Sequence, residues 1–303
     1  MSYKFIFGPV SSRRFGSSLG IDLSPVQKSC NFDCLYCELT KAKAVRTINN
    51  EPTTKAIIDE LKFALNEFKD IDVITITANG EPSLYSDLSN LITQINSLKT
   101  TQKSLILSNG SAVLNPEISK ALLKLDIVKF SLDSADPKTF RKIDRSIDRI
   151  DTDNLIELMS EFRAKFKGEL IMEVLVVAGY NDSDDEFIAL NRAFKKISPH
   201  RVDISTIDRP PAHNASGVSS ERLYYLSTFI DSAPVTIASK TPLKSKFNYT
   251  QSELEKLLKL RPQSLYDIEN NYTQNAKSNL QNLINQGKIT ECDLGGMKFY
   301  RIL

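Results

Sequence analysis

Three cysteines within eight residues are the strongest chemical signal in the sequence. Cys30, Cys34 and Cys37 follow the spacing C-x3-C-x2-C, and Cys292 lies far along the chain. Thiolates on one short loop can converge on a metal ion or on an iron–sulfur cluster. Three thiolates are one ligand short of a closed four-thiolate site, so a bound iron would keep an open position for another molecule.

Two other kinds of site could use close cysteines: a disulfide with a spare thiol, or a structural zinc ion. The start of the sequence has no charged-then-apolar signal pattern, so a reducing compartment is expected and disulfides are disfavoured. The two histidines, His200 and His213, are remote, and structural zinc usually pairs two close cysteines with a second close pair. The spacing therefore favours a redox cluster.

The composition is that of an ordinary globular protein. The chain has 303 residues, 41% of them hydrophobic and 25% charged, and its formal net charge is +2. This charge neither requires nor excludes a nucleic-acid partner. No apolar run approaches the roughly 20 residues that a membrane span needs. The expected location is the cytoplasm, with no membrane partner.

Short apolar runs alternate with longer helical patterns along the first 235 residues. Strands are predicted at residues 19–24, 73–77, 104–107, 127–132, 170–177 and 202–206. Helices are predicted at residues 54–68, 85–98, 115–125, 153–166, 184–197 and 219–229. A strand-then-helix repeat predicts a parallel α/β sheet, either open or barrel-like.

Each predicted strand is followed by polar or turn-forming residues. The cysteines follow the first strand; the later groups are Asn79-Gly80-Glu81-Pro82, Ser108-Asn109-Gly110, Ser131 with Asp133 and Ser134, Ala178-Gly179-Tyr180-Asn181, and Asp208-Arg209-Pro210-Pro211. Any one group could simply form a turn. Sites in α/β sheets and barrels lie at the carboxyl ends of the strands. Six groups at one edge therefore favour a barrel-like sheet with one functional rim.

The pattern changes after a short basic linker at residues 239–247. Residues 1–238 would form the α/β domain and residues 248–303 a second domain. Helices are predicted there at residues 250–260, 264–270 and 275–286, with Thr250 and Glu253 as a capping box. Strands at 288–292 and 297–302 around Gly295-Gly296 complete the pattern of a winged helix-turn-helix. Its near-neutral charge leaves nucleic-acid contact and protein packing both open.

The cysteine motif resembles that of the radical S-adenosylmethionine (radical SAM) superfamily. Tyr36 precedes the last cysteine, and Gly80-Glu81-Pro82 is similar to the superfamily's Gly-Gly-Glu motif. The resemblance covers about residues 4–235 and implies a partial (β/α)6 TIM-like barrel. It implies a [4Fe–4S] cluster on the three cysteines, with SAM on the fourth iron. An electron from a flavodoxin- or ferredoxin-type donor would cleave SAM to methionine and a 5′-deoxyadenosyl radical that abstracts hydrogen from a substrate.

The resemblance also implies which residues contact SAM. The adenine ring would lie beside Tyr36, Val177 and Gly179. The methionine ammonium group would be held by the four residues after the second strand, Asn79, Gly80, Glu81 and Pro82. An alternative role for Glu81 is to cap the next helix.

Further polar residues have two possible roles each. The ribose hydroxyls or the SAM carboxylate could be bound by Ser108, Asn109, Ser131 and Asp133, or these residues could form turns and caps. Arg209 would close the site or pair with a surface acid. Lys129 and Glu173 fall within strands, where alternation could point either one into the barrel, and a buried charge needs a partner or a function.

Two adjacent arginines, Arg13 and Arg14, precede the first strand and suggest a substrate-binding anion loop over the site, or else a solvated turn. Residues 7–22 resemble uncharacterised bacterial and archaeal radical SAM proteins distantly related to the tRNA wyosine synthases. Those synthases use a second cysteine set that the barrel lacks here, so a wyosine-type reaction is disfavoured, and Cys292 is expected to pack.

The favoured hypothesis is a radical SAM enzyme. Its substrate is unknown, and RNA, particularly tRNA, is the favoured candidate. The alternative is a non-catalytic iron–sulfur sensor that binds DNA through the winged helix.

Overall fold

One curved, eight-stranded sheet dominates the structure, which is a computed structural model that describes residues 3–12, 14–237, 246–294 and 297–303. The strands are ordered in space as they occur in the chain. β1 (Ile6–Ser12) runs antiparallel to its neighbour, and all the others run parallel. The parallel strands are β2 (Gly16–Asp22), β3 (Val73–Thr77), β4 (Lys103–Ser108), β5 (Ile127–Ser131), β6 (Glu169–Val176), β7 (Arg201–Thr206) and β8 (Val235–Ile237).

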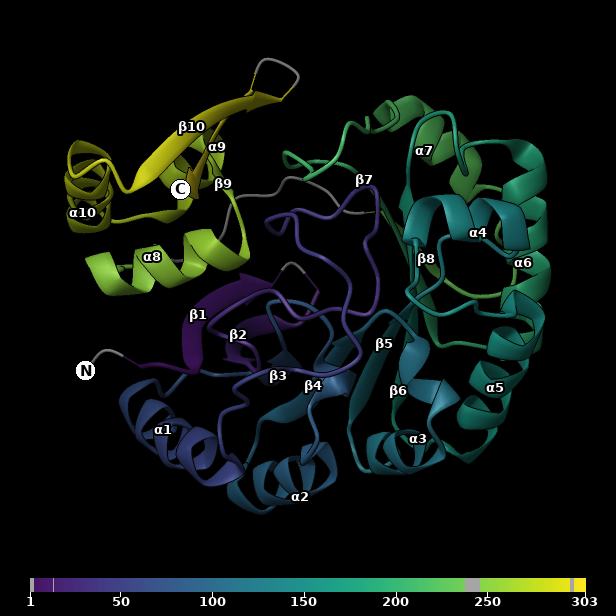
Figure 1. Cartoon of the computed structure of the whole chain (residues 1–303), viewed down its shortest axis with the longest axis horizontal. Helices are drawn as coiled ribbons and strands as arrows, with labels where there is room; N and C mark the ends of the chain where they lie inside the picture. The colour runs from purple at the N-terminus through teal and green to yellow at the C-terminus, as the bar shows by residue number, and fades with distance from the viewer. Residues whose placement is uncertain (1–2, 13, 238–245, 295–296) are drawn as a thin grey trace.

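Helices connect the parallel strands and form an arc outside the sheet (Figure 1). They are α1 (Thr54–Glu67), α2 (Leu88–Leu98), α3 (Pro116–Leu122), α4 (Pro137–Asp144), α5 (Thr152–Lys165), α6 (Asp184–Ile197) and α7 (Ser220–Ser227). Most begin at a side-chain cap: Thr53, Asn115, Asp136, Asp151, Ser183 and Ser219 each accept a hydrogen bond from a first-turn amide. Short 3-10 turns, η1 (Pro82–Leu84) and η2 (Ser111–Leu114), follow β3 and β4.

Alternate residues of each strand have different surroundings. In β3, Ile74 and Ile76 belong to the large core between sheet and helices, whereas Val73 packs in a small inner cluster with Leu105, Ile127 and Ile171. Phe15, from the turn between β1 and β2, packs against the inner cluster. That turn lies at the amino-terminal ends of the parallel strands, so this apolar cluster fills the barrel interior at the end opposite the functional rim.

The last part of the chain builds a smaller unit with its own core. It contains α8 (Gln251–Leu260), α9 (Leu265–Asn271), α10 (Gln274–Asn285) and a three-stranded antiparallel sheet of β9 (Gln263–Ser264), β10 (Ile289–Leu294) and β11 (Met297–Ile302). The capping box of Thr250 and Glu253 is present. This C-terminal unit lies beside β1 (Figure 1), and Val10 of β1 packs against its core.

The six predicted strands and six β–α units are all present. The sequence did not predict β1, β8, β9 or α4. β1 contains Gly8 and Pro9, which indicate a loop, but an edge strand with an irregular register tolerates both. The Gly295-Gly296 turn, most of the linker at 239–247 and Arg13 lie outside the described residues.

Candidate functional site

The three cysteines lie on one long segment, residues 23–53, that connects β2 to α1 and is called the cysteine loop below. All three thiols are free and partly buried. Burial raises the pKa of Cys34 well above its ordinary value, and the nearby Asp144, Cys30 and Cys37 raise it further. The thiols are therefore close enough to interact electrostatically.

Gly80 joins the cysteine loop to the loop after β3. The Ser29 amide donates to the Asn79 carbonyl at 2.8 Å, and the Glu81 amide donates to the Ser29 carbonyl at 2.9 Å. Gly80 has φ +139°, and a Cβ there would lie 1.8 Å from the Ser29 carbonyl oxygen. Only glycine allows this approach. The second predicted motif therefore meets the backbone one residue before Cys30.

Glu81 joins the loops after β3 and β4. Its Oε1 accepts from the Ser83 amide at 3.0 Å and its Oε2 from the Asn109 amide at 2.8 Å. Burial raises the pKa of Glu81, although these hydrogen bonds and one with Ser108 act to lower it. Glu81 caps the short turn η1, which begins at the buried Pro82, and not the following helix α2 as the alternative prediction had it, because Asp87 is the N-cap residue of α2. The carboxylate also positions Asn109.

Asn109 in turn contacts the cysteine loop. Its Nδ2 donates to Asn31 Oδ1 at 2.8 Å, and its Oδ1 accepts from the Ser111 hydroxyl at 2.7 Å. Ser108 is buried, and its Oγ accepts from the Gly110 amide at 3.2 Å. The loops after β2, β3 and β4 are thus one hydrogen-bonded unit.

Tyr36 and Asp133 come together, as their predicted place on one rim requires. The Tyr36 hydroxyl donates to Asp133 Oδ2 at 2.5 Å, and Asp133 Oδ1 accepts from the Leu175 amide at 2.7 Å. Tyr36 also packs in an apolar cluster with Val177. Gly179, two residues beyond, is exposed with φ +75°, and Ser131 ends β5 partly buried beside Glu173.

Sequence reasoning missed Asp144, which lies at the end of α4. Its Oδ1 accepts from the Cys34 thiol at 3.5 Å, and its carboxyl group is in close contact with that of Asp133. Burial raises the pKa of both carboxyl groups, and repulsion from Asp133 raises the pKa of Asp144 further. Helix periodicity marks Asp144 only as a polar residue, so nothing in the sequence pointed to this pair.

Arg209 is partly buried and contacts the cysteine loop. Its Nε lies 3.6 Å from Glu38 Oε2 and donates to the Pro262 carbonyl at 3.0 Å. Its Nη1 lies 3.3 Å from Asp208 Oδ1.

His213, which the sequence did not indicate as a site residue, also contacts this loop, because its Nε2 lies 2.8 Å from Asp33 Oδ1.

Charged side chains fill the barrel interior between the rim and the apolar cluster. Lys129 Nζ lies 2.5 Å from Glu173 Oε1 and 3.2 Å from the fully buried Asp203. Lys129 and Glu173, the two charged residues predicted within strands, therefore form an ion pair. Arg14 enters from the opposite end and pairs with the same carboxylates at 3.2 and 3.3 Å. The predicted position of Arg14 in a loop over the site is therefore wrong: the β1–β2 turn lies at the amino-terminal ends of the strands.

The residues fit a cluster with an open iron. The ammonium group of Lys28 is buried and donates to Cys37 Sγ at 3.2 Å, which provides positive charge for a thiolate-rich group. Among the described residues, no three His, Cys, Asp or Glu side chains are grouped tightly enough for a single metal ion. In a four-iron cluster, each thiolate binds a different iron.

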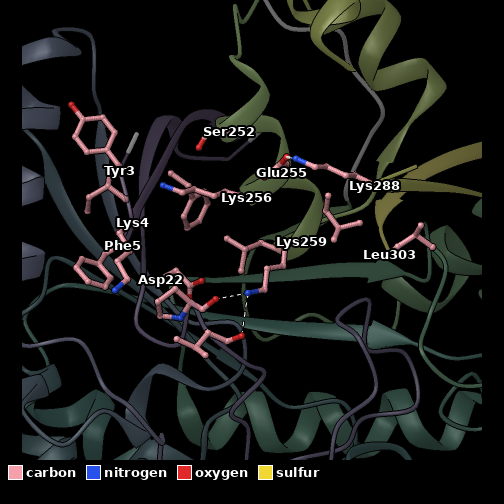
Figure 2. A pocket seen from close by; sticks show the side chains of 16 residues that line it. Tyr3, Lys4, Phe5, Asp22, Ser252, Glu255, Lys256, Lys259, Lys288 and Leu303 are labelled. Carbon is pink, nitrogen blue, oxygen red and sulfur yellow. Dashed lines mark hydrogen bonds and ion pairs between the residues drawn. The ribbon is translucent and has the colours of Figure 1, made fainter. Parts of the chain in front are cut away.

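A cavity of about 580 Å³ lies away from the cysteines, between β1 and the C-terminal unit. Figure 2 shows Lys256 of α8 facing Tyr3 and Lys4 across it, whereas Lys259 of the same helix points towards backbone carbonyl groups. Lys259 donates to the carbonyls of Pro25 and Val26 at the start of the cysteine loop. The cavity walls are mostly apolar, and four lysines line it: Lys4, Lys256, Lys259 and Lys288.

Comparisons with known proteins agree with this geometry. The sequence model of the radical SAM superfamily matches residues 24–191, from the cysteine loop into α6. The chain belongs to the radical SAM superfamily. It is also 40% identical to a UPF0026 protein of Helicobacter pylori strain J99 over 97% of this chain and 96% of that protein. A UPF0026 protein of Methanocaldococcus jannaschii is 27% identical over 97% of this chain and 94% of that protein.

Solved structures share the fold of this radical SAM protein. Streptococcus suis SuiB bound to its precursor peptide SuiA has a TM-score of 0.58 at 18% identity, and 73% of this chain matches 48% of SuiB. The chain thus spans about half the length of the SuiB chain it matches. TYW1 with a lysine–pyruvate adduct bound has a TM-score of 0.50 at 14% identity, over 72% of this chain and 74% of TYW1.

The cofactors of the superfamily are a [4Fe–4S] cluster and SAM, and they are the cofactors of this chain. SuiB and the enzyme anSMEcpe have each been solved with SAM bound. The alternative hypothesis of a non-catalytic sensor receives no support from these comparisons. No helix among the described residues is long and apolar enough to cross a membrane.

Proposed function

We propose that Cys30, Cys34 and Cys37 hold the [4Fe–4S] cluster and that the chain cleaves SAM reductively to act on RNA, with tRNA foremost. The observation that carries the SAM chemistry is the Ser29–Gly80 backbone bridge, which brings the two family motifs together. When bound and reduced by a flavodoxin- or ferredoxin-type donor, the cluster supplies the electron that converts SAM to methionine and a 5′-deoxyadenosyl radical. The protein would bind and orient the cluster and SAM.

The methionine end of SAM would bind at the loop after β3. We assign the ammonium group to the segment 79–82, because the buried Glu81 supplies negative charge there and its carboxylate is fixed by two backbone amides. An arriving ammonium group offsets the cost of burying that carboxylate. Ser108 and Asn109, joined to the same unit, are assigned to the ribose hydroxyls or the carboxylate.

The adenine end would bind beside Tyr36 and Val177. Both belong to one apolar cluster, and the hydrogen bond to Asp133 fixes the tilt of the Tyr36 ring. Gly179 leaves open space, since no atom lies within 4 Å of a Cβ built there. Arg209 acts at this end by holding Glu38, the residue after the last cysteine.

Domain boundaries follow from the two separate cores. We propose a barrel domain at 1–238, a linker at 239–247 and a winged helix at 248–303, on the basis of three helices followed by a β-hairpin. The lysine-lined cavity between them supports an RNA partner, because ammonium groups over apolar and aromatic walls suit phosphates and bases.

Anaerobic reconstitution tests the SAM chemistry. Protein loaded with iron and sulfide, then given dithionite and SAM, is expected to form 5′-deoxyadenosine, measured by chromatography. Cys34→Ala is expected to hold no full cluster and to form none. Cys292→Ala is the matched control and is expected to retain both, because Cys292 lies on β10. A fully iron-loaded wild-type protein that forms no 5′-deoxyadenosine refutes the proposal.

Charge reversal tests the RNA partner separately. Lys256→Glu is expected to weaken binding of bulk tRNA and to reduce the slope of log Kd against log salt by about 1. The control is Lys165→Glu on α5, whose exposed ammonium pairs with Glu161 on the outer surface. Equal effects of both variants, or none, would remove the cavity from the proposed RNA site.

A further inference from the structure

Lys28 is a buried cation at the cysteine loop. It lies two residues before Cys30, and only 9% of it is exposed. Its Nζ donates to Cys37 Sγ at 3.2 Å, and its charge also acts on Cys30. The ammonium group therefore contacts one of the three thiols and is close enough to a second to lower its pKa. No family motif quoted above includes this residue.

The charge of Lys28 is not balanced by a carboxylate. Within the described part of the chain, no Asp or Glu oxygen lies within 4.0 Å of its Nζ. The buried acids near the cysteines are engaged elsewhere: Glu81 with backbone amides, and Asp144 with Cys34 and Asp133. A buried ammonium group is costly unless an opposite charge meets it. Thiolates that carry an iron–sulfur cluster would supply that charge.

We propose that Lys28 raises the reduction potential of the cluster by donating to Cys37 and stabilising the reduced form. This inference rests on the proposed assignment of the three cysteines as ligands. One-electron reduction adds one negative charge to the cluster, and a cation at hydrogen-bond distance stabilises the reduced form more than the oxidised form. Hydrogen bonds to the sulfurs and net charge are the determinants of cluster potential. Lys28 thereby keeps a low-potential cluster within reach of its electron donor.

Lys28 would act on the cluster through Cys37 and would not itself contact the substrate. Because Lys28 is buried, solvent screens its ammonium group only weakly. Methionine has nearly the same length and no charge, whereas arginine keeps the charge and the donor. The substitutions Lys28→Met and Lys28→Arg therefore separate the charge from the packing of the side chain.

Redox titration of the reconstituted protein tests the proposal. Electron paramagnetic resonance of samples poised with dithionite gives the midpoint potential of each variant. Lys28→Met is expected to lower the ratio of reduced to oxidised cluster about tenfold at a given potential. For a one-electron couple, this corresponds to a midpoint potential lower by about 59 mV. Lys28→Arg is expected to stay within a third of that shift. The control is Lys43→Met, an exposed lysine of the same loop, which is expected to leave the potential unchanged.

The outcomes separate this proposal from its rivals. An unchanged midpoint in Lys28→Met, or an equal fall in Lys43→Met, overturns it. An unchanged midpoint with a raised Kd for SAM would assign Lys28 to the SAM carboxylate and also overturn it. If Lys28→Met binds no iron, Lys28→Gln is titrated in its place with the same criterion. Failure of the wild-type protein to hold a cluster would instead refute the proposed function.

Discussion

At the residue scale, Gly80 makes the sharpest prediction. Gly80→Ala would place a methyl group 1.8 Å from the Ser29 carbonyl oxygen. The backbone of residue 80 also has φ +139°, which alanine rarely adopts. The hydrogen bonds between the two loops must therefore break. SAM binding, measured by equilibrium dialysis of reconstituted protein, is expected to weaken more than tenfold. Gly287→Ala, just beyond α10, has a similarly positive φ of +69° but no atom within 4 Å of the added Cβ, and it should bind SAM nearly normally. Equal losses in both variants would contradict the bridge.

The hydroxyl group of Tyr36 is expected to stabilise the fold through its hydrogen bond to the buried Asp133. Tyr36→Phe removes the hydroxyl group that donates to Asp133 Oδ2 at 2.5 Å. The buried Asp133 carboxyl group then lacks this hydrogen bond. Urea unfolding of the cluster-free protein is expected to show a loss of about 1–3 kcal/mol. Tyr180→Phe, on an exposed ring of the loop after β6, is expected to change stability by less than about 0.5 kcal/mol. Loss of stability in neither variant would show that the hydrogen bond contributes little.

Sequence and structure agree at some of these residues and diverge at others. The cysteines and Gly80 could be identified because a fixed spacing and a backbone requirement leave a mark in sequence. Lys28, Asp144 and His213 could not, because their partners lie on other segments and only the fold brings them together. Arg14 was misplaced because the sequence did not predict β1, which turns the arginine towards the other end of the barrel.

At the element scale, the strands were predictable because both faces of each strand are covered. Ile74 and Ile76 face the helices while Val73 faces the interior, so β3 is a continuous apolar run. β8 is only three residues long and partly exposed, which leaves too little pattern to predict. Helix ends were displaced by up to three residues where a 3-10 turn precedes the helix, as at α2.

Asp126 ties α2, β4 and β5 together at the amino-terminal ends of the strands. It accepts hydrogen bonds from Lys99 and from the Ser104 amide and hydroxyl. Burial alone would raise the pKa of Asp126, but these donors lower it below the ordinary value. A carboxyl group whose pKa is lowered in the folded state stabilises the fold at pH values above its unfolded pKa of about 3.9. This stabilisation is lost as the pH falls through the pKa of the folded state.

Asp126→Asn is therefore expected to reduce the free energy of unfolding at pH 7 and to flatten its fall between about pH 5 and pH 3. Urea unfolding across that range is the measurement. The control is Asp59→Asn on α1, where Lys55 also lowers the pKa but the pair is exposed on the helix surface. Solvent screening should make its effect small. A pH profile of Asp126→Asn identical to that of the wild type would remove Asp126 from the acid response.

At the scale of the whole molecule, the two cores are connected at few points. The C-terminal core takes in Val10 of β1, the Tyr249 hydroxyl donates to the Pro9 carbonyl at 3.1 Å, and Lys259 reaches the cysteine loop. Sequence patterns predicted the elements of each unit and the change of composition between them. They could not predict how the units meet, because those contacts are mostly single side chains on backbone carbonyls, which have no periodic signature.

Arg209 contacts the barrel through Asp208, the cysteine loop through Glu38 and the C-terminal unit through the Pro262 carbonyl. Arg209→Met removes all three contacts. We expect calorimetry to show the C-terminal core melting separately from and below the barrel, where the wild type melts in a more cooperative transition. The loss is moderated because Arg209 also repels the partly buried Arg261, whose pKa it lowers.

The matched control is Arg222→Met. Arg222 holds the Asp182 carbonyl and Asp184, which are both within the barrel, so its loss should lower the main transition without separating a second one. Glu38 lies next to Cys37, so Arg209→Met should also speed the loss of iron from reconstituted protein, followed by the visible absorbance of the cluster. If the unfolding of Arg209→Met were as cooperative as that of the wild type, coupling between the units would have to lie in the packing of β1 against α8 instead.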